Sequence, residues 1–174
     1  ASGYSDDKDI TSAILYAAEN DIRVLNMSFG DVTLSSVVCD AVQYAYAQGV
    51  VMCASAGNDG TDEPHYPSSF EEVVSVVATT QADQLAYFSS HGLTVDLGAP
   101  GSGCPTTMPY YDGNYTDSFA GTSAAAPHAA GAAALILSLH PEYTPKQVRG
   151  LLVSTADDIA TDGWDHYTGG GRLN

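Results

Sequence analysis

The residues best suited to chemistry in this chain gather around one serine. Residues 121–122, Gly-Thr, precede Ser123, and residues 124–134 are all small except for Pro127 and His128. Such a run predicts a buried helix that begins near the serine, because a proline is tolerated only close to the first turn. A hydroxyl at a helix N-terminus lies where the helix dipole and unpaired N–H groups stabilise negative charge. Ser123 is therefore a candidate nucleophile for a reaction that passes through an oxyanion.

A purely structural role explains the same position. Serine is a favoured helix-capping residue, and Thr122 is also placed to cap the helix start. The small residues that follow lie on every face of the helix, so they predict burial all round. Position alone leaves the cap and the nucleophile as alternatives for Ser123.

The elements around this helix alternate between helical and extended patterns. Helical periodicity predicts helices over residues 9–20, 35–48 and 144–154, and apolar runs predict strands over residues 22–29, 50–56, 73–78 and 95–99. This alternation is typical of one parallel sheet with helices on both faces. In such sheets functional residues collect at the carboxyl ends of strands, here Ser28–Gly30 and Ala56–Asn58. Asp112-Gly113 predicts a hairpin turn within residues 110–119.

Composition limits the classes of partner. The chain has 174 residues, the size of one domain, and its 21 acidic and 5 basic residues give a net charge of −16. That charge argues against nucleic acid, because phosphate binding needs clustered Lys and Arg. We also expect no membrane partner, since no apolar run is judged long enough to cross a bilayer. The three cysteines, Cys39, Cys53 and Cys104, have no metal-site spacing and predict no disulfide framework.

A string of motifs resembles the subtilisin-like serine peptidases, the subtilase family. Residues 121–128, Gly-Thr-Ser-Ala-Ala-Ala-Pro-His, resemble the family's nucleophile signature. Residues 26–30, Asn-Met-Ser-Phe-Gly, resemble the strand that pairs with substrate, and residues 54–58, Ala-Ser-Ala-Gly-Asn, resemble the segment that carries the oxyanion asparagine. The likeness continues in family order through essentially the whole chain.

The resemblance implies a fold and a set of roles. The expected fold is α/β, a parallel sheet with helices on both faces in a subtilisin-like three-layer sandwich. It is expected to be incomplete, lacking the N-terminal strands, with residues 1–174 forming the C-terminal portion of a single catalytic domain. Ser123 is then the nucleophile, and its N–H and the side-chain amide of Asn58 bind the oxyanion. The implied substrate-binding residues are Ser28, Phe29 and Gly30, which offer backbone to an extended peptide, and Ala54, Ser55, Ala56 and Gly57, which form a pocket wall.

The sequence lacks the motifs of the other two triad members. The family carries its Asp and His before the segments found here, so we expect both upstream of residue 1 and predict that the isolated chain is inactive. His91-Gly92 is the nearest look-alike, but it follows a later family segment and is expected to be a loop residue. His128 points away from Ser123 on the same helix, and the family residue there is structural. His65, near the pocket, either tunes specificity or is an ordinary surface residue.

These expectations define one function and its rivals. The first is a secreted serine endopeptidase that acts on polypeptides through an acyl-enzyme on Ser123, without a cofactor. No metal is assigned: Asp96 matches a family position near a weak cation site, but a calcium site is not assignable from it. The expected partner is the missing N-terminal part of the domain or a self-associated copy, because the strand at 22–28 is left as an open apolar edge. The alternatives are a non-catalytic, peptide-binding pseudo-peptidase and an unrelated α/β protein that binds a small molecule.

Overall fold

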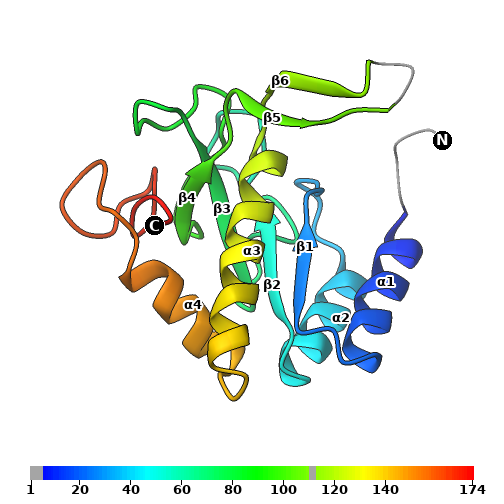
Figure 1. Ribbon diagram of the computed structural model, residues 1–174. Coiled ribbons are helices and arrows are strands. Elements are labelled where there is room, and N and C mark those ends of the chain that lie inside the picture. The colour runs from blue at the N-terminus through cyan, green and yellow to red at the C-terminus, as the bar shows by residue number, and fades with distance from the viewer. Residues whose placement is uncertain (1–5, 110–112) are drawn as a thin grey trace.

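A four-stranded parallel sheet forms the centre of the molecule (Figure 1). The computed structural model describes residues 6–109 and 113–174. The strands lie in the order β1 (Val24–Met27), β2 (Val51–Ser55), β3 (Val73–Thr79) and β4 (Leu97–Pro100), and each neighbouring pair is parallel. A separate antiparallel pair, β5 (Cys104–Thr107) and β6 (Tyr115–Phe119), stands apart from this sheet. The parallel α/β sheet expected from the sequence is confirmed.

Helices cover both faces of the sheet. Helices α1 (Asp7–Glu19) and α2 (Ser36–Ala47) pack on one face, and α3 (Thr122–Leu139) and α4 (Pro145–Ser154) pack on the other. Three of the four begin with a side-chain cap: Asp6, Ser35 and Thr144 each accept a hydrogen bond from the backbone N–H three residues later. Proline at the first position of α4 needs no intrahelical partner for its nitrogen.

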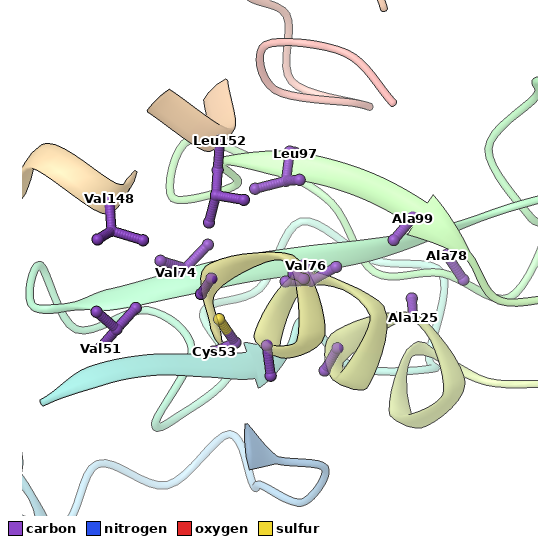
Figure 2. Packing of buried hydrophobic residues seen from close by; sticks show 14 of the residues in the cluster. Val51, Cys53, Val74, Val76, Ala78, Leu97, Ala99, Ala125, Val148 and Leu152 are labelled. Carbon is purple, nitrogen blue, oxygen red and sulfur yellow. The ribbon is translucent and has the colours of Figure 1, made fainter. Parts of the chain in front are cut away.

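Alternate residues of β2 enter opposite halves of the core. Val51 and Cys53 belong to the cluster beneath α3 and α4, whereas Met52 and Ala54 belong to the cluster beneath α1 and α2. Figure 2 shows the first cluster, in which Val51 and Cys53 lie with residues of β3, β4 and α4 around the α3 helix. Because side chains alternate across a strand, continuous apolar runs are explained by burial on both faces. The three-layer arrangement is therefore confirmed.

Small side chains let α3 approach the sheet closely. The helix contacts all four parallel strands, and Ala125, Ala126, Ala129 and Ala133 are fully buried. The expectation that α3 is buried all round is wrong, since its outer face is open to solvent and Leu135 is 69% exposed. Alanines lie on every face of this helix, so their pattern could not reveal which face meets the sheet.

Helix α3 corrects the expectation that no apolar run in this chain is long enough to cross a bilayer. Its 18 residues have a mean hydropathy of 1.3, which is long and apolar enough for a candidate membrane span. Its buried alanines pack against the strands of the central sheet, however. The helix is therefore explained as the core helix of this α/β fold.

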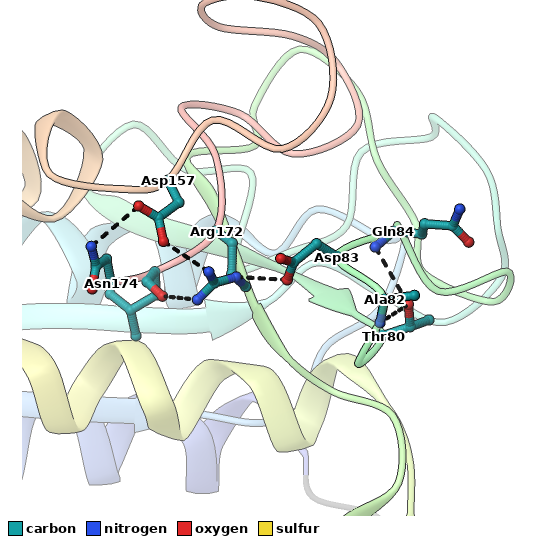
Figure 3. A network of polar contacts seen from close by, with 8 residues as sticks. Thr80, Ala82, Asp83, Gln84, Asp157, Arg172 and Asn174 are labelled. Carbon is teal, nitrogen blue, oxygen red and sulfur yellow. Dashed lines mark hydrogen bonds and ion pairs between the residues drawn. The ribbon is translucent and has the colours of Figure 1, made fainter.

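The C-terminal segment closes the β4 edge of the sheet. The backbone of residues 169–173 pairs with β4 at Leu97 and Gly98. Arg172 holds this segment in place through ion pairs with Asp83, at 2.7 Å, and Asp157, at 2.8 Å (Figure 3). At the opposite edge, β1 has no second strand partner among the described residues.

The structure refines two predictions about strands. β1 is shorter than the expected strand over residues 22–29, because Ser28–Gly30 leave the sheet after Met27. The expected hairpin exists as β5 and β6, and Gly113 has a φ of 94°, a left-handed value that favours glycine at a turn. Asp112, the other half of the expected turn, lies outside the described residues.

A buried ion pair links α4 to the sheet. Asp96, only 7% exposed, accepts hydrogen bonds from Arg149 Nε at 2.7 Å and from the backbone N–H of Ser75 at 2.8 Å. Burial raises the pKa of Asp96, and the Arg149 charge partly opposes that rise. A raised pKa means that ionising this carboxyl in the folded chain costs stability as the pH rises.

Replacing Arg149 with Leu should therefore destabilise the protein in a pH-dependent way. At about pH 8 the loss in free energy of unfolding should reach about 3 kcal/mol, because a buried carboxylate loses its counter-charge. The loss should shrink as the pH falls through the further raised pKa of Asp96, since the protonated carboxyl needs no partner. Urea unfolding at about pH 8 and about pH 5 measures both values. The double variant Arg149→Leu with Asp96→Asn is the control and should recover most of the loss at the higher pH; an equal cost at both pH values would contradict this account.

Candidate active site

The N-terminus of α3 presents Ser123 at the carboxyl edge of the sheet. Gly121 precedes the helix, and Ser123 is its second residue, so the N–H of Ser123 has no partner within the helix. The Ser123 side chain is half-buried, and its Oγ donates a hydrogen bond to the carbonyl of Ser28 at 3.3 Å. Thr122 is not the cap expected from the sequence; it is the first helical residue and is fully buried.

Thr122 instead joins the helix start to the end of β2. Its backbone N–H donates to Asn58 Oδ1 at 2.8 Å, and its hydroxyl donates to the same oxygen at 3.1 Å. The hydroxyl also lies 3.3 Å from both the N–H and the carbonyl of Gly57. These contacts fix the Asn58 amide by its oxygen, so that its NH₂ group points away from Thr122.

The two nitrogen donors expected to bind an oxyanion both lie close to Gly121. The point where a Cβ would stand on Gly121 is 3.7 Å from the N–H nitrogen of Ser123, 3.7 Å from Asn58 Oδ1 and 3.9 Å from Asn58 Nδ2. Glycine leaves this space open, whereas a side chain there would occupy it. The structure thus brings Ser123 and Asn58 together at the start of α3.

Pro127 creates a contact that the sequence analysis missed. The carbonyl of Ser123 would normally accept from the N–H four residues later, but residue 127 is proline and has none. That carbonyl accepts instead from Ser28 Oγ, at 2.9 Å. Ser28 and Ser123 therefore each donate a hydroxyl to the other's carbonyl, which ties the end of β1 to the helix start.

The two segments expected to bind substrate separate where β1 and β2 end. Their parallel ladder stops at Met27 and Ala54. Beyond it, the first segment turns away, and Asp31 pairs with Tyr66 through two backbone hydrogen bonds of 2.8 and 2.9 Å. The second segment stays beside β3, to which the Ala56 N–H donates at 3.0 Å.

The two segments expected to bind substrate differ in their exposure to solvent at the gap between them. Phe29 and Gly30 are exposed and Ser28 is half-buried, so their backbone is accessible. Residues 54–57 are all buried, and the side chains of Ala54 and Ala56 lie in apolar clusters. Gly57 contributes a bare backbone with a φ of 108°. His65, which the sequence predicts to be either a specificity residue or an ordinary surface residue, lies between the two segments.

No general base faces Ser123 within the part of the chain that the structure describes. Its hydroxyl hydrogen bonds there to the Ser28 carbonyl, which cannot remove a proton. His91 stacks on Tyr167 with ring centres 5.1 Å apart, and His128 Nδ1 lies 2.8 Å from the carbonyl of Ala124. These contacts agree with a loop role for His91 and a structural role for His128.

An open groove of about 870 Å³ begins at Ser28–Gly30 and follows the free edge of β1. Apolar side chains from β1, α1 and α2 line much of it, including Ile10, Leu25 and Val38. Close by, Val32, Leu34 and Val37 are each more than half exposed. The groove is thus a largely apolar surface that continues directly from the segment expected to bind substrate.

The described residues contain no group of three or more metal-ligating side chains. Both carboxylate oxygens of Asp96 are occupied, one by Arg149 and the other by the Ser75 N–H. The position that resembled a weak cation site therefore holds an ion pair.

Comparison with known proteins assigns this arrangement to a family. The model of the Subtilase family matches residues 1–171. The chain belongs to the subtilases. The subtilisin of Bacillus pumilus is 41% identical over 169 residues, which are 95% of this chain and 59% of that protein. Subtilisin E of Bacillus subtilis is 40% identical over 169 residues and is covered to 43% of its length.

Solved structures of proteases superpose closely on this one. Fervidolysin from Fervidobacterium pennivorans, described as a keratinolytic enzyme related to subtilisin, has a TM-score of 0.90 at 35% identity; the match covers 100% of this chain and 29% of that one. The S41 psychrophilic protease has a TM-score of 0.89 at 33% identity, with 99% of this chain and 65% of that one covered. This subtilase chain therefore spans less than two thirds of the relatives it matches.

The reciprocal hydrogen bonds between Ser28 and Ser123 can be tested by a double-mutant cycle. Ser28→Ala should lower the free energy of unfolding by about 1–2 kcal/mol, because the Ser123 carbonyl is left without a donor. In a Pro127→Ala background the same substitution should cost markedly less, since residue 127 then supplies the helical N–H. Denaturant unfolding of the four proteins gives the coupling energy. An equal cost of Ser28→Ala in both backgrounds would show that Pro127 does not create the demand for the Ser28 hydroxyl.

Proposed function

We propose that the protein containing this chain is a serine endopeptidase that cleaves peptide bonds through an acyl-enzyme on Ser123. The observation that carries the proposal is that the Ser123 N–H and the Asn58 amide both lie beside Gly121 at the start of α3, where Thr122 holds the amide by its oxygen. Acyl transfer needs a nucleophile next to fixed donors that stabilise negative charge on the carbonyl oxygen. Membership of the subtilase family supports the same reaction.

The proposed reaction begins with a peptide extended along Ser28–Gly30. Backbone groups of this segment pair with the substrate as an added strand. Ser123 Oγ attacks the carbonyl carbon, and the oxygen that gains the negative charge lies between Asn58 Nδ2 and the Ser123 N–H. The helix dipole of α3 stabilises the same charge. The Ser123 proton passes to a base, and the amine of the cleaved bond leaves with a proton before water releases the acyl group.

We place that base and its orienting carboxylate outside residues 1–174, in an N-terminal part of the same catalytic domain. Among the described residues the Ser123 hydroxyl bonds to a backbone carbonyl, so its activation needs a group from elsewhere. The free edge of β1 and its apolar groove provide a surface on which such a part can pair and pack. The shorter span of this chain relative to its relatives agrees with that arrangement.

Two further attributes complete the proposal. The substrate is a polypeptide, since Ser28–Gly30, which contact Ser123 through Ser28, offer backbone groups to an extended chain. We propose secretion as the location, because one relative, 37% identical over 172 residues, is the minor extracellular protease Epr of Bacillus subtilis.

A peptide-binding pseudo-peptidase is the second candidate. It is favoured by the hydrogen bond that holds the Ser123 hydroxyl on the Ser28 carbonyl, a resting arrangement that needs no base. In that case residues 28–30 and 54–57 bind peptides, and the whole protein lacks the base as well. The two candidates differ in the reactivity of Ser123 in the complete protein.

A fluorophosphonate probe distinguishes them, because it reacts with an activated serine. The complete protein should be labelled at Ser123, and the Ser123→Ala variant should lose the label. Ser138→Ala, which removes an exposed hydroxyl on the same helix, is the matched control and should keep it. Residues 1–174 alone should not react. Absence of label on the complete, folded protein would favour the pseudo-peptidase.

Residues 1–174 alone should also associate with themselves or with the N-terminal part. The edge of β1 offers unpaired backbone groups, and the groove beside it is apolar. Sedimentation velocity should therefore find dimers or larger species that dissociate when the N-terminal part is supplied. Leu34→Lys, which puts a charge into this apolar surface, should weaken the association. A stable monomer in the absence of any partner would contradict the proposed role of this edge.

A further inference from the structure

His65 fills the gap that opens where the two substrate-binding segments separate. Its ring nitrogen Nδ1 lies 2.7 Å from the point where a Cβ would stand on Gly30. On the other side, its Cδ2 lies 3.1 Å from the same point on Gly57. A side chain at either glycine would collide with the ring or press on it, so both walls of the gap are bare backbone with the imidazole between them.

The gap lies where a substrate side chain has to go. In the proposed reaction, the carbonyl attacked by Ser123 directs its oxygen toward Asn58 and the Ser123 N–H. The residue that bears this carbonyl then lies against Ser28–Gly30, and its side chain extends between that segment and Gly57. Bulk in the gap therefore competes directly with the side chain that precedes the cleaved bond.

The imidazole is held there as an uncharged group. Its Nδ1 is buried without a hydrogen-bond partner, and the whole side chain is half-buried. Burial lowers the pKa of His65, against the opposing influence of the Ser55 carbonyl and the Asp59 and Asp31 carboxylates. Near neutral pH the ring thus acts through its volume rather than through a positive charge.

We propose that His65 restricts this pocket to small side chains, so that the enzyme cleaves after Gly, Ala or Ser in preference to large apolar residues. The inference rests on the proposed peptidase function and deepens it by naming a substrate class. The ring removes the space that a Leu or Phe side chain needs. Specificity of this kind is a difference in transition-state binding between substrates.

The test compares substrates that differ at one residue. The complete protein is assayed with extended peptide substrates carrying Ala or Phe before the cleaved bond, and the ratio of the two kcat/KM values is the readout. His65→Ala opens the gap and should raise the Phe-to-Ala ratio about 10- to 100-fold. His65→Leu keeps comparable bulk and should leave the ratio close to that of the parent. His140→Ala, at an exposed histidine that pairs with Glu142, is the surface control.

The outcomes separate this inference from the proposed function. An active parent whose ratio is unchanged in His65→Ala would overturn the role of His65 and leave the peptidase intact. Absence of turnover in the parent would overturn the peptidase; the pocket is then tested by the affinity of product-like peptides that end in Ala or Phe. His65→Ala should tighten the Phe peptide by a similar factor, and an unchanged affinity ratio overturns the inference. His65→Asn, smaller than histidine but still polar, gives the same comparison if His65→Ala does not fold.

Discussion

Two hydrogen bonds from Thr122 to the side-chain oxygen of Asn58 hold the site together. They join the loop after β2 to the first residue of α3, two segments that are more than sixty residues apart in sequence. They engage the oxygen of the amide and so leave its NH₂ group free of Thr122. Full burial of Thr122 makes this connection hard to replace, because a buried polar group that loses its partner is destabilising. The geometry of Ser123 thus depends on the packing of α3 against the sheet.

Small side chains and one proline in α3 determine how this helix packs against the sheet and holds Ser123. Alanines at the buried positions of α3 allow it to contact all four strands. Pro127 leaves the Ser123 carbonyl without a helical donor, and the Ser28 hydroxyl donates a hydrogen bond to it instead. The consequence is that Ser123 and Ser28, at the end of β1, share two hydrogen bonds, so a residue expected to meet the substrate also fixes the helix start. The same strand end begins the apolar groove along the free sheet edge.

The sequence predicted the fold well because its patterns depend on local chemistry. Continuous apolar runs marked β2 and β3 as strands buried on both faces, and helical periodicity placed the starts of α2 and α4 to within a residue. The motif around Ser123 identified the family, which the match over residues 1–171 confirms. Its polar neighbours Asn58 and Ser28 could be named from the same resemblance.

Other features depend on contacts between distant segments, which a single sequence does not display. The exposed face of α3 was missed because alanine occurs on all its faces. Thr122 was expected to cap the helix, whereas tertiary contacts with Gly57 and Asn58 use its hydroxyl. The gap filled by His65 arises only because residues 28–31 turn from β2 toward Tyr66. A proline four residues after Ser123 was a signal for the freed carbonyl, but the identity of its donor required the fold.

The central claim is that Ser123 and Asn58 form one site that binds an oxyanion. A crystal structure of the complete protein with a peptide aldehyde tests it most directly, because the adduct carries an oxygen in the position of the reaction intermediate. We expect a covalent bond to Ser123 Oγ, with the adduct oxygen about 2.7–3.1 Å from both Asn58 Nδ2 and the Ser123 nitrogen. An adduct on another residue, or an oxygen turned away from both nitrogens, would contradict the account.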